Sequence, residues 1–339
     1  MAGQADIKKK TLLIKDYLLK YSDEENPVST NELIEMLKNN GIECERKSIY
    51  NDISILGDCG LDIIKTRKNG GGYFIGSRDF ELVEVRLLID AVQSAGFITA
   101  QKSKKLIKKI GSLCSEAQMK KLTQQVYIDN RVKNKNESIY YYIDILSDAI
   151  ASGKMISCKY LKCRDAVNVA KVKMPEKDLT LSPYALIWSA DHYYLVANNS
   201  KYDNLMHLRI DRMKNVKLIE GSTARPFEEV CEYRNYFDVA DYSKRVFNMF
   251  SGAIEDIELW CHIDVLEQIL DRFGEDVSIR QDFDNEDHFF VRAKAAVSPG
   301  LVSWLMQFEN NIKVLSPQSL IDGIMEKIIK ISAQYKSDD

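Results

Sequence analysis

The residues with the clearest potential for chemistry lie within residues 181–213. Polar and apolar residues alternate near the end of this stretch, so His207, Arg209 and Asp211 are predicted to leave one face of a strand together. Arg212 follows directly. Because a guanidinium fork matches the oxygens of phosphate or carboxylate two at a time, this face is predicted to bind an anion. An internal His–Asp or Arg–Asp pair, with a purely structural role, is the open alternative.

This stretch resembles the WYL domain of bacterial transcriptional regulators. Three pieces occur in the family's order and approximate spacing, namely Pro183-Tyr184, Tyr193 to Ala197 and His207 to Met213. Tyr193 stands where the family has its eponymous Trp, and Met206 stands where an Arg often precedes the His. The second departure removes one potential anion contact. The three pieces together are specific, whereas any one of them alone is a weak signal.

The resemblance implies both a fold and a ligand class. It implies an SH3-like (Sm-like) β-barrel over residues 137–221 that senses a nucleotide or a short single-stranded nucleic acid. Aromatic side chains would stack on a base and arginines would hold phosphate. The candidate ligand-binding residues are Tyr160, Tyr184, Tyr194, His207, Arg209 and Arg212.

Residues 1–78 are predicted to form a winged helix-turn-helix. Apolar residues recur at helical spacing over residues 7–21, 29–41 and 46–59, and two short strands at residues 63–67 and 73–75 flank a Gly-rich turn. Ser29 and Glu32 have the spacing of a capping box. In such a domain the third helix enters the major groove of duplex DNA and the hairpin lies along the phosphate backbone.

Within the third helix, residues 47–56 resemble the recognition helix of DeoR-like regulators, although Lys47 and Asn51 stand where those relatives often carry Arg. Asn51 would suit adenine. The candidate DNA-binding residues are Arg46, Lys47, Ser48, Tyr50, Asn51, Lys65, Arg67 and Lys68. Residues 1–78 hold 12 Lys+Arg and 12 Asp+Glu, a net charge of zero, which keeps open the alternative of a solvated helix in a protein-binding winged helix, whereas the WYL domain downstream supports DNA reading.

The remaining segments complete an α+β multidomain chain. Residues 79–136 are predicted to be a helical linker that ends in a polar boundary at residues 130–136, and its lysine-rich helix is interpreted as a solvated face. Residues 222–339 are predicted to begin with an aromatic helix at 225–250. They continue as strand-helix-strand-strand-helix-strand, a ferredoxin-like order. This part resembles the C-terminal extension that commonly follows WYL domains.

Composition narrows the function classes. The chain has 339 residues, 45% of them hydrophobic and 29% charged, and its N-terminus lacks the apolar core of a signal peptide. No apolar run is long enough for a transmembrane helix, and seven scattered cysteines favour reduced thiols, so a cytoplasmic location without membrane partners is expected. Residues 250–339 hold 8 Lys+Arg against 17 Asp+Glu, a net charge of −9 that disfavours nucleic-acid binding there.

No catalytic, metal or cofactor site is predicted. The chain has no P-loop, no GxSxG, no HExxH and no pair of CxxC motifs, and Cys158 with Cys163 lacks a second matched pair for zinc. The leading hypothesis is therefore a ligand-responsive DNA-binding transcriptional regulator, not an enzyme. Its expected partners are double-stranded DNA, an anionic effector and a second copy of the chain. The alternative is a WYL-type accessory module that binds RNA or a protein partner and has a non-reading winged helix.

Overall fold

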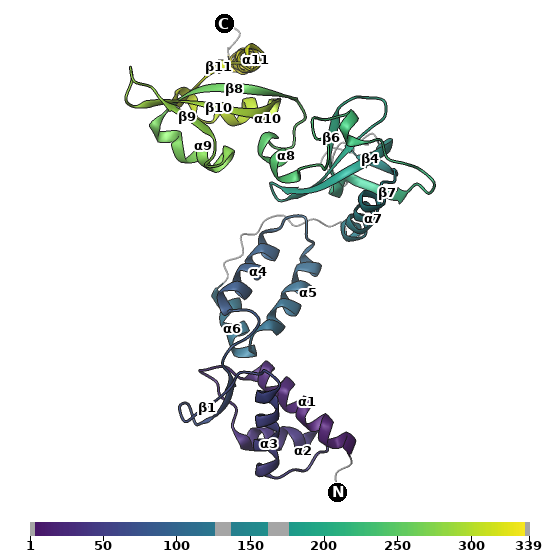
Figure 1. The fold of residues 1–339 in the computed structure, drawn as a ribbon, viewed down its shortest axis with the longest axis vertical. Coiled ribbons are helices and arrows are strands. Elements are labelled where there is room, and N and C mark those ends of the chain that lie inside the picture. The colour runs from purple at the N-terminus through teal and green to yellow at the C-terminus, as the bar shows by residue number, and fades with distance from the viewer. Residues whose placement is uncertain (1–3, 126–136, 162–175, 336–339) are drawn as a thin grey trace. The chain divides into compact units, whose positions relative to one another are not determined.

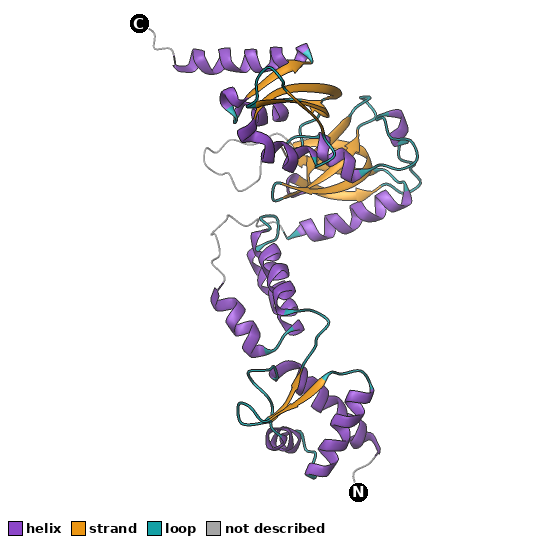
Figure 2. Ribbon diagram, turned by 60° about the vertical axis from the view of Figure 1, so that its left-hand side comes forward, coloured by secondary structure: helices purple, strands orange, loops and turns teal. Residues whose placement is uncertain are grey.

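The computed structural model describes residues 4–125, 137–161 and 176–335 (Figures 1 and 2). The chain divides into two compact units, Met1–Lys135 and Asn136–Asp339. The predicted boundary segment, residues 130–136, lies outside the described residues. Within the described ranges, no helix combines the length and the apolar character that crossing a lipid bilayer requires.

The first unit begins with three helices and a hairpin, in the predicted order. These elements are α1 (Gln4–Tyr21), α2 (Thr30–Asn39), α3 (Arg46–Asp58), β1 (Ile63–Thr66) and β2 (Gly72–Ile75). The predicted capping box of α2 is present, because the Glu32 amide donates to Ser29 Oγ at 3.2 Å and the Ser29 amide donates to the Glu32 carboxylate at 2.6 Å. The pair satisfies two backbone donors that the start of a helix leaves open.

α3 packs its apolar stripe into the core of this three-helix part. Ile49, Ile53 and Leu56 are buried there, as their spacing predicts. The hairpin is joined to the segment before α2, because Tyr73 of β2 and Val28 exchange two backbone hydrogen bonds of 2.9 and 2.8 Å, and both residues belong to the same core. The orientation of α3 relative to the hairpin is therefore fixed by packing on one side and by backbone pairing on the other.

A small helical part completes the first unit. It consists of α4 (Leu82–Ser94), α5 (Ala100–Ile110) and α6 (Glu116–Gln125), which bury a separate apolar cluster. Thr99 caps α5, accepting from the Lys102 amide at 3.3 Å. The lysines at 104, 105, 108 and 109 are exposed on α5. Lys20 of α1 and Glu116 of α6 are 3.1 Å apart, so the two parts of the unit touch.

The second unit opens with a helix and a five-stranded antiparallel sheet. The elements are α7 (Ser138–Ser152), β3 (Ile156–Leu161), β4 (Glu176–Ser189), β5 (His192–Asn198), β6 (Leu205–Arg209) and β7 (Met213–Leu218). Gly153 ends α7 with a φ of 60°, as its position predicts.

The order of this sheet is β6-β5-β4-β3-β7, which corrects the predicted closed barrel. The long strand β4 pairs with β3 through its first half and with β5 through its second half. The edge strands β6 and β7 are joined by the 3₁₀ turn η2 (Ile210–Arg212), but they do not pair with each other over the described residues. The alternation in the sequence predicts strands and buried faces, but it does not specify whether two edge strands meet.

The aromatic segment after the sheet is mostly irregular, so the helix predicted over residues 225–250 is wrong. Only η3 (Phe227–Glu229) and α8 (Val239–Arg245) are helical there. Tyr233, Phe237 and Tyr242 pack against the sheet together with apolar residues of β4 and β5. An extended segment can deliver aromatic rings at uneven spacing to one surface, whereas a helix would direct part of them into solvent.

The C-terminal part has the predicted order of elements. They are β8 (Ala253–His262), α9 (Leu266–Phe273), β9 (Ser278–Gln281), β10 (His288–Val297), α10 (Pro299–Met306), β11 (Ile312–Ser316) and α11 (Gln318–Tyr335). The strands form an antiparallel sheet in the order β11-β8-β10-β9. Apolar residues of its helices, together with Phe247 just after α8, pack against this sheet and form a core with it. Figure 2 shows α11 running past the sheet toward the C-terminus.

Candidate functional site

Exposed polar and basic side chains cover one face of α3. Lys47, Tyr50 and Asn51 are all exposed, and they lie on the face opposite the buried apolar stripe. Arg46, at the start of the helix, donates from Nη2 to Asn31 Oδ1 of α2 at 2.5 Å. This face has the donors and the planar group that contact phosphates and base edges.

The hairpin extends this surface. Lys65 Nζ of β1 lies 5.7 Å from the ring centroid of Tyr50 on α3 and 5.8 Å from that of Tyr73 on β2. Arg67 and Lys68 are exposed at the start of the turn between the strands. The cation–π contact joins the hairpin to α3, and exposed basic residues lie on both of these elements.

Ser48 is the exception among the eight candidate DNA-binding residues. Its hydroxyl accepts a hydrogen bond from Lys10 of α1, and the side chain is only partly accessible. The helical wheel places Ser48 on a flank of α3. The tertiary structure turns that flank toward α1, where the hydroxyl joins α1 to α3.

The candidate ligand-binding residues fall into two separate groups in the second unit. Tyr160 of β3, Tyr194 of β5, Arg209 of β6 and Arg212 of η2 form the first group, which we call the Arg209 cluster. The backbone amide of Arg209 donates to the Tyr160 hydroxyl at 3.3 Å, and a hydrogen bond from Arg212 also reaches that hydroxyl. Burial raises the pKa of Tyr160 and of Tyr194. The Arg209 amide and the Arg212 guanidinium oppose this rise at Tyr160, and both guanidiniums oppose it at Tyr194.

Arg209 is held by a carboxylate of its own chain. Its Nε lies 3.0 Å from Asp211 Oδ1 and its Nη2 lies 2.7 Å from Oδ2, and the Asp211 side chain is 3% exposed. The prediction that Asp211 points outward along the same strand is wrong, because the strand ends at Arg209 and Asp211 lies in η2. The internal Arg–Asp pair that the sequence left open is therefore present. Part of the Arg209 fork is already satisfied, so an incoming anion must compete with Asp211 or use Arg212.

His192, to which the sequence assigns no role, lies next to the Arg209 cluster. It begins β5 directly after the two-residue turn at Ala190 and Asp191, and its Nδ1 is 3.3 Å from Arg209 Nη2. Its spacing of two residues before Tyr194 is the signal that could have placed both rings on one face of the strand. The rings are 6.3 Å apart at 65°.

His207 and Tyr184 lie outside this cluster. His207 Nε2 is 2.8 Å from the Tyr242 hydroxyl and its Nδ1 is 3.1 Å from Ser251 Oγ, so both ring nitrogens bind residues from the segment that follows the sheet. Burial lowers the pKa of His207 from 6.5 to about 4, so the imidazole is neutral near pH 7 and gives no positive charge to an anion site.

Tyr184 is likewise a packing residue. Its hydroxyl donates to the Arg225 carbonyl at 2.9 Å, and its ring stacks on Phe237 at 6.4 Å and 22°. Four of the six candidate ligand residues are thus brought together, and two serve the junction between the sheet and the aromatic segment.

The cysteines of the sheets have the character of buried thiols. Burial raises the pKa of Cys158 and of Cys261 to about 12 each. Cys163 lies outside the described residues. Over the described part of the chain, no group of three or more His, Cys, Asp or Glu side chains is placed to hold a metal ion.

Comparison with known protein families finds two domains in the second unit. A WYL domain matches residues 141–218 and a WCX domain matches residues 253–331. The predicted WYL domain is confirmed, and it contains every member of the Arg209 cluster. The predicted C-terminal extension corresponds to the WCX domain.

Two solved structures align with nearly the whole chain. Proteasome accessory factor B/C (PafBC) of Arthrobacter aurescens is 15% identical with a TM-score of 0.28, over 98% of this chain and 49% of that one. A CRISPR Cas-related protein is 10% identical with a TM-score of 0.24, over 97% of this chain and 84% of that one. The chain thus spans about half the length (49%) of the PafBC chain. No curated protein matches it.

Proposed function

We propose that this protein is a ligand-responsive, DNA-binding transcriptional regulator that acts as a homodimer. In this proposal the first unit reads duplex DNA, and the WYL domain binds an anionic nucleotide or a short single-stranded nucleic acid. The observation that carries the DNA-binding half is that α3 and the hairpin both expose basic residues and are joined by Lys65 over the Tyr50 ring. The WYL match carries the sensing half.

We propose that α1 to β2 constitutes a winged helix-turn-helix. Its α3 would lie in the major groove, where Lys47 and Asn51 meet base edges. Arg67 and Lys68 of the hairpin would contact the phosphate backbone, since charged side chains at a hairpin tip carry no base-specific geometry. The order β11-β8-β10-β9, with two crossing helices, supports a ferredoxin-like fold for the WCX domain.

Sensing would take place at the Arg209 cluster. Arg212 and the face of Arg209 not used by Asp211 would hold phosphate, and Tyr194 would stack on a base. His207 has no part in this, because it is buried and neutral. A ligand that binds one arrangement of the dimer more tightly than the other would shift the population toward that arrangement, and so change how much of the dimer can bind DNA.

DNA reading is tested by fluorescence anisotropy with labelled duplex from the region upstream of the protein's own coding sequence, titrated at several salt concentrations. A specific reader binds this duplex more tightly than a scrambled one. Lys47→Ala then weakens binding and makes the slope of log K against log salt shallower by roughly one unit. Lys104→Ala, an exposed lysine of α5, is the matched control and leaves the slope unchanged.

The opposite result has a defined meaning. If the protein binds specific and scrambled duplexes equally weakly, with and without added single-stranded oligonucleotide, and Lys47→Ala changes nothing, the DNA-reading proposal is wrong. The zero net charge of residues 1–78 favours a second candidate in that case. The protein would then be a WYL-type module that binds RNA or a protein partner. Retention of labelled single-stranded RNA, or of a partner, without duplex binding would support that second candidate.

A further inference from the structure

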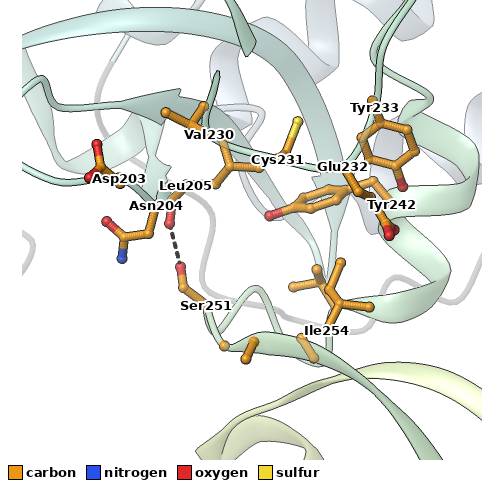
Figure 3. A pocket seen from close by; sticks show the side chains of 14 residues that line it. Asp203, Asn204, Leu205, Val230, Cys231, Glu232, Tyr233, Tyr242, Ser251 and Ile254 are labelled. Atoms are coloured by element: carbon orange, nitrogen blue, oxygen red, sulfur yellow. Dashed lines mark hydrogen bonds between the residues drawn. The ribbon is translucent and has the colours of Figure 1, made fainter. Parts of the chain in front are cut away.

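A cavity of about 520 Å³ lies inside the second unit, away from the Arg209 cluster. It opens between the start of β6, the irregular segment that carries residues 230–233, α8, and residues 251–254 at the start of β8 (Figure 3). The volume falls within the usual range for small-molecule pockets. None of the six candidate ligand residues from the sequence lines it.

The walls of this junction cavity are largely apolar. Leu205, Val230, Val246 and Ala296 are buried residues of the wall and belong to one hydrophobic core, which also includes Ile254. These side chains come from the WYL sheet, from the connecting segment and from the WCX sheet. A molecule in the cavity would therefore touch both domains and the segment between them.

The hydrogen-bond donors of the lining hydroxyls are already committed within the protein. The Tyr233 hydroxyl donates to Asp241 Oδ2 at 2.6 Å, and the Ser251 hydroxyl donates to the Leu205 carbonyl at 2.9 Å. The Cys231 thiol donates to the carbonyl of Phe227 at 3.1 Å. These protons are therefore not available to a ligand.

The hydroxyl proton of Tyr242 is also engaged, through His207, which does not itself line the cavity. Because Ser251 Oγ gives its proton to Leu205, it accepts from His207 Nδ1. A neutral imidazole with the proton on Nδ1 accepts at Nε2, so the Tyr242 hydroxyl donates to Nε2. The oxygens of Tyr242 and Ser251 thus retain lone pairs but no free proton.

The charges at the cavity have one sign. Asp203 and Glu232 line it, and none of its described lining residues is Lys, Arg or His. The two carboxylates pair with arginines that do not line the cavity, Asp203 with Arg225 at 2.9 Å and Glu232 with Arg245. An anion in the cavity would meet two carboxylates and several hydroxyl lone pairs, against which the neutral side-chain amide of Asn204 is available as a donor, so binding of an anion is disfavoured.

We infer that the junction cavity binds a small, mainly apolar molecule that carries an amine or another hydrogen-bond donor, and that it rejects anions. The apolar side chains of the wall pack against the apolar part of such a molecule, and an acceptor at one side of the cavity, on Asp203 or on Glu232 and Tyr242, receives its donor. This specificity is opposite in sign to that of the Arg209 cluster. The second unit would therefore hold two chemically distinct ligand sites.

The experiment tests the full chain with two probes that share a 2-(1-naphthyl)ethyl body and differ in the charged group at its end. The amine is 2-(1-naphthyl)ethylamine and the acid is 3-(1-naphthyl)propionate, each followed by saturation-transfer NMR and titration at neutral pH. The amine is expected to bind at least about tenfold more tightly than the acid, since its ammonium brings donors and a positive charge to a site with two carboxylates, whereas the acid adds a further negative charge. The acid also tests whether burial of the apolar body alone is sufficient for binding.

Two substitutions locate the binding. Ala253→Leu adds volume at an exposed lining position, and Ala296→Leu adds it to the buried wall. Both substitutions are expected to weaken binding of the amine at least about tenfold, because the larger side chain fills the cavity. Ala240→Leu, an exposed alanine of α8 that does not line the cavity, is the matched control and leaves binding unchanged. Because Ala253 is exposed, its variant remains informative if Ala296→Leu fails to fold.

Three results would overturn the inference. The first is binding of the acid as tightly as the amine, and the second is amine binding that Ala253→Leu leaves unchanged in a folded protein. The third is the absence of saturation transfer to either probe.

Discussion

Lys10 Nζ lies 2.8 Å from Asp52 Oδ2, and the two side chains are 9% and 3% exposed. This ion pair joins α1 to the buried edge of α3. Thr11 Oγ1 donates to the other Asp52 oxygen at 2.9 Å, and Lys10 also reaches Ser48. The pair therefore fixes where α3 stands, while the opposite face of the same helix carries Lys47 and Asn51.

Breaking the Lys10–Asp52 pair on one side is expected to cost more than removing it altogether. Asp52→Asn leaves a buried ammonium without its counter-charge, for a loss of about 3–5 kcal/mol in the free energy of unfolding. The double variant Lys10→Met with Asp52→Leu removes both charges and is expected to lose less than Asp52→Asn alone. Calorimetry of the full chain, following the transition of the first unit, measures the free energy of unfolding of the unsubstituted protein and of both variants. If the double variant loses at least as much as Asp52→Asn, this account of the pair is wrong.

Asp211 is expected to limit anion binding at the Arg209 cluster. Asp211→Asn removes a negative charge that shares the Arg209 fork, so single-stranded oligodeoxynucleotide should bind several-fold more tightly and with a steeper salt dependence. Arg212→Ala should weaken the same binding. Isothermal titration with a short oligothymidylate measures both, and Lys217→Ala, an exposed lysine of β7, is the control for nonspecific charge. Tighter binding by Lys217→Ala, or no change with Asp211→Asn, would contradict the assignment.

His207 is expected to make the second unit acid-sensitive. Its pKa falls from 6.5 in the unfolded chain to about 4 when folded. The unfolded state therefore binds a proton that the folded state does not, over the window between these values. This contribution to stability is complete above pH 6.5 and is lost as the pH falls toward 4, by about 1.4 kcal/mol per pH unit.

The measurement is urea unfolding followed by tryptophan fluorescence. All three tryptophans, at 188, 260 and 304, lie in the second unit, so the signal reports on this unit. Between pH 7 and pH 5 the protein should lose about 2 kcal/mol more than His207→Gln, which cannot titrate. Equal losses in the two proteins would show that His207 is not the group responsible.

Gly72 is expected to be required for seating the hairpin. A Cβ at this position would lie 2.3 Å from the Val28 carbonyl oxygen, and φ is +153°. Gly72→Ala should therefore separate the hairpin from the segment before α2 and expose the Tyr73 amide, which donates to Val28. Gly70→Ala is the matched control, because φ there is +88° but no atom lies within 4 Å of the added carbon. Hydrogen exchange at Tyr73 should accelerate much more in Gly72→Ala; similar rates in both variants would rule out the clash as the cause.

The sequence by itself determined the elements that depend on near neighbours in the chain. Capping at Ser29 and Thr99, the buried stripe of α3 and the strands of both sheets follow from residue spacing, because caps and faces are set within a few residues. The WYL domain was also identifiable, since its motif residues are grouped between Pro183 and Met213.

The tertiary structure alone decided the pairings between distant residues. His207 meets Tyr242 and Ser251 from a segment that local periodicity wrongly predicts as a continuous helix, and those contacts bury and neutralise the imidazole. Asp211 turns back to Arg209 because the strand ends at Arg209, a boundary that the alternation does not mark. Whether a side chain faces a ligand or another part of its own chain depends on packing between separate elements, and sequence spacing does not encode that packing.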